Sequence, residues 1–397
     1  MSTSPSSASQ ALMNGVPSPS LAAKGLKNRG IVALLLAPLL LVAVVRPALA
    51  SDLVQEAITL PAVFMETDGP QDIPLEALVV RPADAKPHPL VVLSHGSPRD
   101  TDKRESMAPQ SMTREAEALA LRGFVTVVVM RRGYGQSGGD NAEEYGDCAH
   151  PDYVAAGRQG ARDIREAIRL MGAKPFVDPN RVVCLGRSAG GFASVALAAD
   201  PPPGLAAVIN FAGGRGSLED GEVCDREALV RAFGVFGTTA RTPMLWVYAK
   251  NDQYFGPDLA RAMHQAFQAS GGKAELILAP DFGEDGHTLF SRQGIPVWTR
   301  YVDDFLVKLG LASSPLPPPA PTAQASPPGA LSAKGRKAFE EYLEAPPHKA
   351  FAMSSQGYFS WRSGRRTQAE AAEDAREACV ENAEASCRVV MLDDTSQ

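Results

Sequence analysis

The sequence predicts an α/β protein with a mostly parallel central sheet covered by helices on both faces, followed by a small α+β module at the C-terminus. The first observation is that short apolar runs alternate with segments of helical periodicity from residue 90 to residue 309. Such alternation is typical of buried parallel strands joined by crossover helices. The second is that polar residues follow several of these runs, at the sheet edge where such proteins place their sites.

Each element follows from its own apolar pattern. Two alternating segments, 58–65 and 75–80, predict an antiparallel strand pair that opens the sheet. Apolar runs predict further strands at 90–94, 125–130, 182–185, 206–211, 244–249 and 275–279. Helical periodicity predicts helices at 113–122, 154–171, 192–199, 258–269 and 296–309. Residues 213–241 separate two strands and are long enough for a cap of one or two helices.

A G-x-S-x-G motif is the most informative stretch. The apolar strand ending at Leu185 runs into Gly186-Arg187-Ser188-Ala189-Gly190, and a helix of small residues follows. A strand, a turn that requires flanking glycines and a helix N-terminus together form a nucleophile elbow, which exposes a reactive serine. Ser188 is therefore the candidate nucleophile, and the alternative is an ordinary glycine-rich loop.

A second G-x-S-x-G, at residues 135–139, is interpreted as structural. It looks superficially like the nucleophile region of chymotrypsin-type proteases. In those proteases the histidine and aspartate lie far upstream on two β-barrels, whereas here about forty residues separate His95 from Ser137 and helices alternate with strands. Ser137 is expected in a loop that follows the strand at 125–130.

The strand at 90–94 ends in His95-Gly96-Ser97-Pro98. A glycine after a strand allows a sharp turn, and the next amide can then point into a pocket at the carboxyl end of the sheet. The amide of Ser97 is thus a candidate for one half of an oxyanion hole. We interpret His95 as a structural histidine that braces this loop, with a role as catalytic base as the alternative.

Two further strands are followed by an acid and a base. Asp252 follows the strand at 244–249, and His287 lies in the loop after the strand at 275–279. A serine hydroxyl needs a base, and a histidine base needs a carboxylate to hold its tautomer. The chain order serine, acid, histidine favours this assignment. Alternatively, His287 is a surface histidine and Asp252 a helix N-cap; Asp281, Glu284 and Asp285 are rival acids.

These motifs together resemble the α/β-hydrolase superfamily, nearest to its dienelactone hydrolase-like and acyl-peptidase-like branches. The resemblance spans about Leu53–Leu311 and rests on H-G-S-P at 95–98, R-R-G-Y-G-Q-S at 131–137, G-R-S-A-G-G at 186–191, K-N-D at 250–252 and D-G-H at 285–287. It implies Ser188 as nucleophile, Asp252 as acid, His287 as base, and an oxyanion hole from the amides of Ser97 and Ala189. Dienelactone hydrolases typically carry a cysteine where Ser188 stands, so their lactone activity is not implied.

Two residues are candidates for contact with the substrate. Tyr134 lies in the R-R-G-Y-G-Q-S motif, and Arg215 lies in the expected cap. Arg215 could meet an anionic group of the substrate; the alternative is an exposed surface arginine.

The first fifty residues predict export. Lys24, Lys27 and Arg29 precede an apolar run over 31–45, which ends in Ala48-Leu49-Ala50. This pattern is typical of a signal peptide cleaved after Ala50, with an uncleaved anchor as the alternative and Met13 as an alternative start. The expected location is therefore periplasmic or secreted, with no membrane span after cleavage.

The net charge limits the classes of partner that the protein is expected to bind. Removing the four basic side chains of residues 1–50 from the 39 of the whole chain leaves 35 basic against 45 acidic residues, a net charge of −10. This charge disfavours nucleic acid and anionic membranes as partners. No metal-binding cysteine spacing is present, so we expect no metal and no cofactor.

Five cysteines suit an oxidising compartment. Cys184 lies within an apolar strand and is expected to be free. We predict that Cys148 pairs with Cys224 and Cys379 with Cys387; four separate thiols are the alternative.

The C-terminal region is expected as a separate module. Residues 312–333 contain seven prolines and read as a linker. A strand or hairpin at 350–361, a helix at 368–382 and a strand at 387–392 are expected beyond it. The module resembles small cysteine-paired domains of unknown function in exported bacterial proteins, which suggests binding to an envelope partner. The expected boundaries are 1–50 signal peptide, 51–311 catalytic domain, 312–333 linker and 334–397 C-terminal domain.

The sequence thus predicts an exported serine hydrolase that cleaves a small-molecule or peptide ester through an acyl-enzyme. A serine peptidase or amidase of the same fold is one alternative. Peptidases of the acyl-peptidase type usually carry an N-terminal propeller, for which this chain has no room before its first core strand. The other alternative is a noncatalytic protein that binds an envelope partner.

Overall fold

The computed structural model describes residues 53–312 and 331–397, except Glu384. The expected signal peptide and nearly all of the expected linker lie outside these residues. None of the helices in the described ranges is long and apolar enough to cross a membrane.

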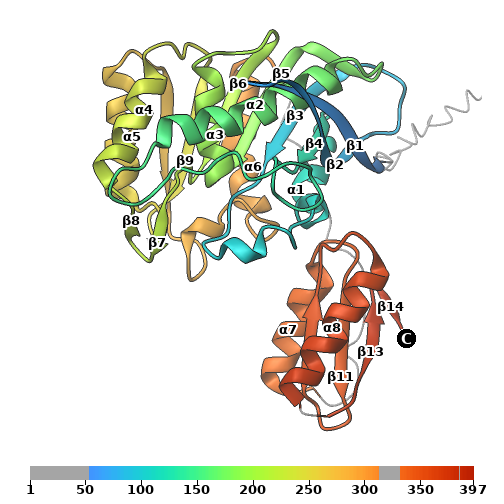
Figure 1. Ribbon diagram of the computed structural model, residues 1–397. Helices are drawn as coiled ribbons and strands as arrows, with labels where there is room; N and C mark the ends of the chain where they lie inside the picture. Colours follow the sequence, from blue (N-terminus) through green and yellow to red (C-terminus); the bar gives the residue numbers. More distant parts are fainter. Residues whose placement is uncertain (1–52, 313–330, 384) are drawn as a thin grey trace, which may run out of the picture. The chain divides into compact units, whose positions relative to one another are not determined.

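An eight-stranded sheet organises the larger part of the chain (Figure 1). Its strand order is β1-β2-β4-β3-β5-β6-β9-β10. The first two strands form an antiparallel pair, β2 is antiparallel to β4, and all other neighbours are parallel. The strands are β1 Leu53–Glu66, β2 Gly69–Pro82, β3 His88–Ser94, β4 Val125–Val129, β5 Val177–Arg187, β6 Leu205–Phe211, β9 Met244–Ala249 and β10 Ala274–Ala279. The predicted antiparallel opening and parallel continuation are confirmed, with β1, β2 and β5 longer than expected.

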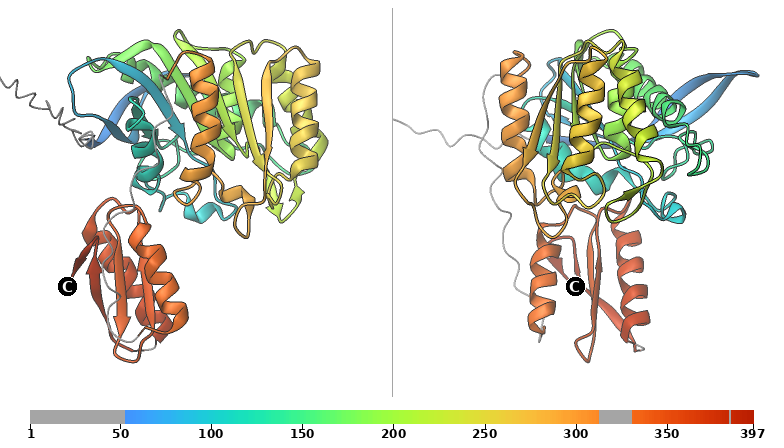
Figure 2. Two further views of the ribbon diagram at one scale, coloured as in Figure 1. Left: turned by 180° about the vertical axis from the view of Figure 1, so that it is seen from behind. Right: turned by 90° about the vertical axis from the view of Figure 1, so that its left-hand side faces the viewer.

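Helices cover both faces of this sheet, and each face has its own core (Figure 2). One core joins the sheet to α2, α3, α4 and α5, and the other joins it to α1 and α6. These helices are α1 Thr113–Ala120, α2 Tyr153–Gly172, α3 Ala189–Ala198, α4 Arg226–Gly237, α5 Pro257–Ala269 and α6 Ile295–Lys308. Burial on both faces explains why the parallel strands read as fully apolar runs.

The register aligns the carboxyl ends of the central strands. Ser94 pairs with Gly186, and Gly186 pairs with Asn210 on the next strand. The residues that follow β3, β5, β9 and β10 therefore lie at one edge of the sheet, as the sequence predicts.

The segment between β6 and β9 forms a short cap. It contains the hairpin β7 Ser217–Glu219 and β8 Glu222–Val223, followed by α4. The predicted pairing of Cys148 with Cys224 is confirmed, with 4.8 Å between their Cα atoms. Since Cys224 precedes α4, this bond fixes the cap to the loop that leads into α2. Cys184 is a free, buried cysteine, as expected.

The C-terminal residues form a small α+β unit with a core of their own. Its sheet has the order β12-β11-β13-β14 and contains β11 Ala350–Ser354, β12 Phe359–Arg362, β13 Cys387–Leu392 and β14 Thr395–Ser396. Helix α8, Gln368–Ala383, packs on this sheet, and the predicted bond between Cys379 and Cys387 ties it to β13.

Helix α7, Ala333–Glu344, was not expected from the sequence. Its first turn is capped by Ser332, whose hydroxyl accepts a hydrogen bond from the amide of Gly335 at 3.0 Å. Phe339 and Tyr342, three residues apart, are buried on one face. The helix starts directly after the proline-rich stretch and contains a glycine and many charges, which obscured this short apolar face.

Candidate active site

Ser188 occupies a sharp turn between β5 and α3. Its backbone has φ 55° and ψ −124°, a conformation that L-residues rarely adopt. The flanking glycines permit the turn, because a Cβ at Gly186 would collide with the backbone of Gly190, and one at Gly190 would collide with the carbonyl of Ser94. This geometry is that of a nucleophile elbow, with the side chain set at the N-terminus of a helix.

His287 and Asp252 lie against each other. The Nδ1 atom of His287 is 3.2 Å from each carboxylate oxygen of Asp252. One of these oxygens also accepts hydrogen bonds from the amides of Tyr254 and Phe255, at 2.8 and 2.9 Å. Two amides and one imidazole therefore hold a buried carboxylate in a single orientation. The ring of Tyr254 stacks on His287, with 4.0 Å between the ring centroids, and restrains the imidazole further.

The rival acids lie elsewhere. Asp285 caps the short 3-10 helix Gly286–Thr288, where its carboxylate accepts hydrogen bonds from the amides of His287 and Gln253. Among the described residues, the carboxylates of Asp281 and Glu284 make no hydrogen bond or ion pair with His287. Asp252 is thus the acid that the fold brings to the imidazole ring.

Ser188, His287 and the loop after β3 line one cavity. Gly96, Ser97 and Tyr254 also line it, and Ala189 lines a smaller hollow that opens beside Ser188. Within the described part of the chain, the amides of Ser97 and Ala189 donate no hydrogen bond to another residue. These two donors are therefore free to bind an oxygen atom next to Ser188.

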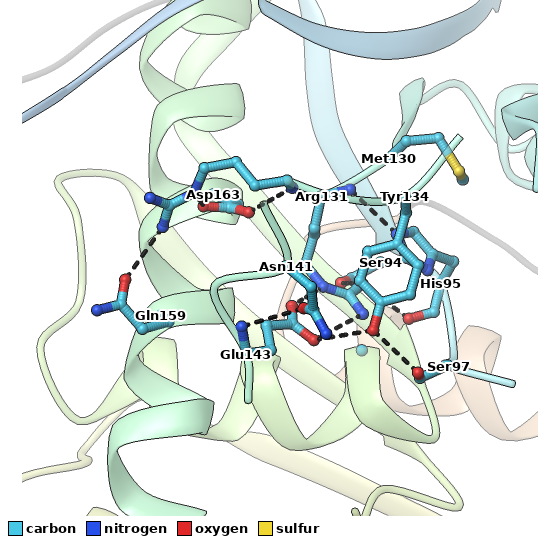
Figure 3. A network of polar contacts seen from close by, with 12 residues as sticks. Ser94, His95, Ser97, Met130, Arg131, Tyr134, Asn141, Glu143, Gln159 and Asp163 are labelled. Carbon is cyan, nitrogen blue, oxygen red and sulfur yellow. Dashed lines mark hydrogen bonds and ion pairs between the residues drawn. The ribbon is translucent and has the colours of Figure 1, made fainter. Parts of the chain in front are cut away.

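Tyr134 does not line either hollow, in contrast to the expectation that it contacts the substrate. Its side chain is fully buried behind the loop after β3. There its hydroxyl donates a hydrogen bond to the Oγ atom of Ser97 at 2.9 Å (Figure 3). Ser137, in the same motif, donates to the carbonyl of Met130 at 2.7 Å and accepts from the amide of Glu76, in agreement with the structural role expected for it.

A buried charge cluster lies behind this loop (Figure 3). Glu143 binds Arg131 through both carboxylate oxygens and binds Arg215 at 2.7 Å. Arg131 also donates to the carbonyl of His95 at 2.7 Å and to the Oγ atom of Ser94 at 2.8 Å, the two residues at the end of β3. Burial by itself would raise the pKa of Glu143, but the two guanidinium groups outweigh it and lower this pKa to about 2.

His95 belongs to the same cluster and is neutral. Its Nε2 atom accepts a hydrogen bond from the amide of Arg131 at 3.1 Å, so the proton resides on Nδ1, which donates to the carbonyl of Gly96 at 2.6 Å. Burial, together with the charge of Arg131, lowers the pKa of His95 well below its ordinary value. These bonds brace the turn at Gly96, in agreement with a structural histidine.

Arg215 lies at the smaller hollow beside Ser188, but its charge is already matched by Glu143. Glu143, Tyr254 and Arg187 were not identified from the sequence as residues of the site. Glu143 lies in a polar loop and meets Arg131 and Arg215 across 12 and 72 residues, a juxtaposition that no local pattern reveals. Tyr254, two residues after Asp252, could have been suspected from that proximity.

The buried ion pairs of Glu143 with Arg131 and Arg215 are expected to stabilise the fold. Glu143→Gln leaves two arginines buried side by side without a counter-charge, which should lower the free energy of unfolding by about 3–5 kcal/mol. Because the pKa of Glu143 is lowered from 4.5 to about 2, its contribution is complete above pH 4.5 and is lost as the pH falls toward 2. Urea unfolding of the oxidised protein at pH 7 and at pH 3 measures both effects.

Glu144→Gln is the matched control. Glu144 is the next residue but forms an exposed ion pair with Arg104, so its loss should cost less than about 1 kcal/mol. A Glu143→Gln protein as stable as the Glu144→Gln protein would show that the cluster contributes nothing.

Residues 68–253 match the model of the S15 family, described as X-Pro dipeptidyl-peptidase. No curated protein matches the sequence.

Several solved structures are similar to the chain. A Klebsiella pneumoniae protein provisionally assigned as a dienelactone hydrolase has 18% identity and a TM-score of 0.46, covering 65% of this chain and 99% of its own. Esterase 2 of Thermogutta terrifontis has 18% identity and a TM-score of 0.44, covering 65% of this chain and 96% of its own. The acylaminoacyl peptidase of Pyrococcus horikoshii has 17% identity and a TM-score of 0.46, and covers 65% of this chain. This chain spans only 42% of that peptidase.

The strand order with its antiparallel opening, the strained serine between β5 and α3, and the match to the S15 family model lead to one assignment. The chain has the α/β-hydrolase fold, and residues 68–253 are similar to the S15 peptidase family.

Proposed function

We propose that this protein is a serine hydrolase that cleaves carboxylic esters, with Ser188 as nucleophile, His287 as general base and Asp252 as the acid that orients the base. The observation that carries the proposal is the placement of a buried Asp252–His287 pair on the same cavity as Ser188. A base held by a carboxylate next to a strained, helix-capping serine is the arrangement that activates a hydroxyl at neutral pH.

The first half of the reaction forms an acyl-enzyme. With Nδ1 of His287 donating to Asp252, Nε2 is free to accept the hydroxyl proton of Ser188 as Oγ attacks the ester carbonyl. The carbonyl oxygen becomes an oxyanion that accepts hydrogen bonds from the amides of Ser97 and Ala189. When the carbon–oxygen bond to the alcohol breaks, the imidazolium of His287 returns the proton to the departing oxygen.

The second half releases the acid. A water molecule attacks the acyl carbon while Nε2 of His287 accepts one of its protons. The oxyanion forms again at the same two amides, the bond to Oγ breaks, and Ser188 regains its proton from His287. The carboxylic acid leaves and the enzyme returns to its starting state.

The S15 match raises peptides of the X-Pro type as a second substrate class. A dipeptidyl peptidase must hold a free α-ammonium group, for which carboxylates in the cavity are the natural partners. Among the described residues that line the two hollows beside Ser188 there is no aspartate or glutamate, whereas several are lysine or arginine. This charge favours an ester over a peptide with a free amino terminus.

Export forms part of the same proposal. The signal peptide over residues 1–50 and the proposed domain boundaries, 51–311 and 334–397, are consistent with two cysteine pairs, which persist in oxidising compartments. We assign the C-terminal unit to binding an envelope partner, since it has its own core and contributes no residue to the proposed triad.

The central experiment replaces the nucleophile. Ser188→Ala should lower kcat for p-nitrophenyl acetate by about 10⁴- to 10⁶-fold, because it removes the attacking oxygen and little packing. Ser137→Ala, the serine of the second motif, is the control and should keep at least a tenth of the activity. Retention of a tenth of wild-type kcat by Ser188→Ala would rule out the proposed function.

The acid is tested separately. Asp252→Asn keeps the shape of the side chain but presents the wrong hydrogen-bonding partner to Nδ1 of His287, so kcat should fall by roughly 10⁴-fold. Asp281→Asn serves as the control, since Asp281 is a nearby rival acid, and should change kcat less than twofold. If Asp252→Asn is nearly as active as the wild type while Asp281→Asn is not, the acid is misassigned.

A further inference from the structure

The hollows beside Ser188 are positively charged, although the whole chain carries a net charge of −6. Lys103 and Arg187 line the larger one, and Arg99, Arg104 and Arg215 line the smaller one. Among the described lining residues no carboxylate offsets them. Such a concentration of one sign of charge raises the local concentration of anions.

Most of these cations already have partners. Arg99 binds Asp220 at 2.9 Å, Arg104 binds Glu144 at 2.8 Å, Arg215 binds Glu143 at 2.7 Å, and Lys103 binds Asp100 at 3.3 Å. Their charges are therefore compensated within the fold and leave little to attract a ligand specifically.

Arg187 is the exception. Across residues 53–312 and 331–397, no aspartate or glutamate oxygen lies within 4.0 Å of its guanidinium group, and its buried Nε atom has no hydrogen-bonding partner. Its one hydrogen bond, from Nη1 to the carbonyl of Phe290, is long at 3.5 Å. Arg187 is half-buried and its Nε atom is fully buried without a partner, and arginine cannot avoid the cost of this desolvation by losing its proton.

Glu115 does not supply a full counter-charge for Arg187. Glu115 on α1 is buried, forms no ion pair with Arg187 and has an unpaired Oε2 atom. Burial raises the pKa of Glu115 to about 7, so only about half of this group is ionised in neutral solution. The guanidinium of Arg187 therefore lines the cavity without an ion-pair partner among the described residues, and Glu115 offsets its charge only in part.

The position of Arg187 relates this charge to the reaction. Arg187 precedes the nucleophile, and its Nε atom lies 3.7 Å from the point where a Cβ of Gly96 would stand, beside the turn that presents the amide of Ser97. Arg187 and Ser188 line the same cavity, so an anion bound by Arg187 lies close to the carbonyl that Ser188 attacks.

We propose that Arg187 binds a carboxylate of the substrate, and that the natural substrate is an ester carrying a free carboxylate close to the scissile bond. This inference rests on the proposed function and adds its substrate class. Arg187, with five donors in a planar fork, suits bidentate recognition of such a group. The role expected for Arg215 from the sequence, contact with an anion, is thereby assigned to Arg187.

The test compares matched esters. Mono-p-nitrophenyl glutarate and p-nitrophenyl methyl glutarate differ in charge on the acyl side; 4-acetoxybenzoate and methyl 4-acetoxybenzoate differ on the alcohol side. For at least one pair, the wild type should show a kcat/KM at least tenfold higher for the anionic ester. Arg187→Met should lower this ratio by about 10- to 100-fold, the usual effect of one charged hydrogen bond, and Arg187→Lys should restore part of it.

Lys103→Met is the control for the general field of the cavity. Lys103 is paired and 70% exposed, so its removal should change the ratio less than threefold. The inference is overturned if the wild type prefers neither anionic ester, if Arg187→Met leaves the ratio unchanged, or if Lys103→Met lowers it equally.

Inhibition of the wild type and the pattern of hydrolysis of the four esters distinguish the remaining outcomes. If Arg187→Met does not fold, the wild type is used alone: monomethyl glutarate should inhibit competitively at least tenfold better than dimethyl glutarate, and equal inhibition contradicts the inference. Hydrolysis of the neutral esters that depends on Ser188, with no preference for charge, would refute the carboxylate site and leave the proposed function standing. Failure to hydrolyse any of the four esters would refute both.

Discussion

The backbone at Ser188 is the constraint on which the site depends. A non-glycine residue at φ 55° costs about 1–3 kcal/mol, and the structure keeps it there by close packing of Gly186 and Gly190 against neighbouring backbone. The parallel register brings the ends of β3, β9 and β10 to the same edge, so the loops that carry Ser97, Asp252 and His287 all meet this turn. The position of Ser188, the proposed nucleophile, thus depends on the sheet topology and on the two glycines that flank it.

The loop opposite the serine is held by charge rather than by apolar packing. Arg131 and Glu143 are buried, and Arg131 donates hydrogen bonds to Ser94 and to the carbonyl of His95, directly before the turn at Gly96. Neutral His95 and the hydroxyl of Tyr134 complete this support. A buried ion cluster contributes little net stability, but it fixes positions to fractions of an ångström when all its members are paired. The proposed role of the Ser97 amide as an oxyanion donor depends on that accuracy.

Much of the fold and of the candidate site was predictable from the sequence. Strands buried on both faces appear in the sequence as apolar runs, and the candidate site residues follow these runs in the chain order serine, acid, histidine. The cysteine pairing was predictable too, since the apolar strand around Cys184 excludes it from the polar loops that hold the other four. What escaped prediction depends on side-chain direction and long-range pairing. The sequence does not show that the hydroxyl of Tyr134 points back to Ser97 or that Glu143 meets Arg215 from 72 residues away. Nor does it show that Arg187 forms no ion pair among the described residues and has an unpaired Nε atom.

The central claim is that Ser188 is activated by the pair formed by His287 and Asp252. The most direct measurement treats the folded, oxidised wild-type protein with a fluorophosphonate and locates the adduct by intact mass and peptide mapping. The account predicts one adduct per chain, on Ser188, and at least a thousandfold slower labelling of Asp252→Asn, because the phosphonylation step needs the same activated oxygen. A folded protein that gains no adduct, or gains it on Ser137, would contradict the account.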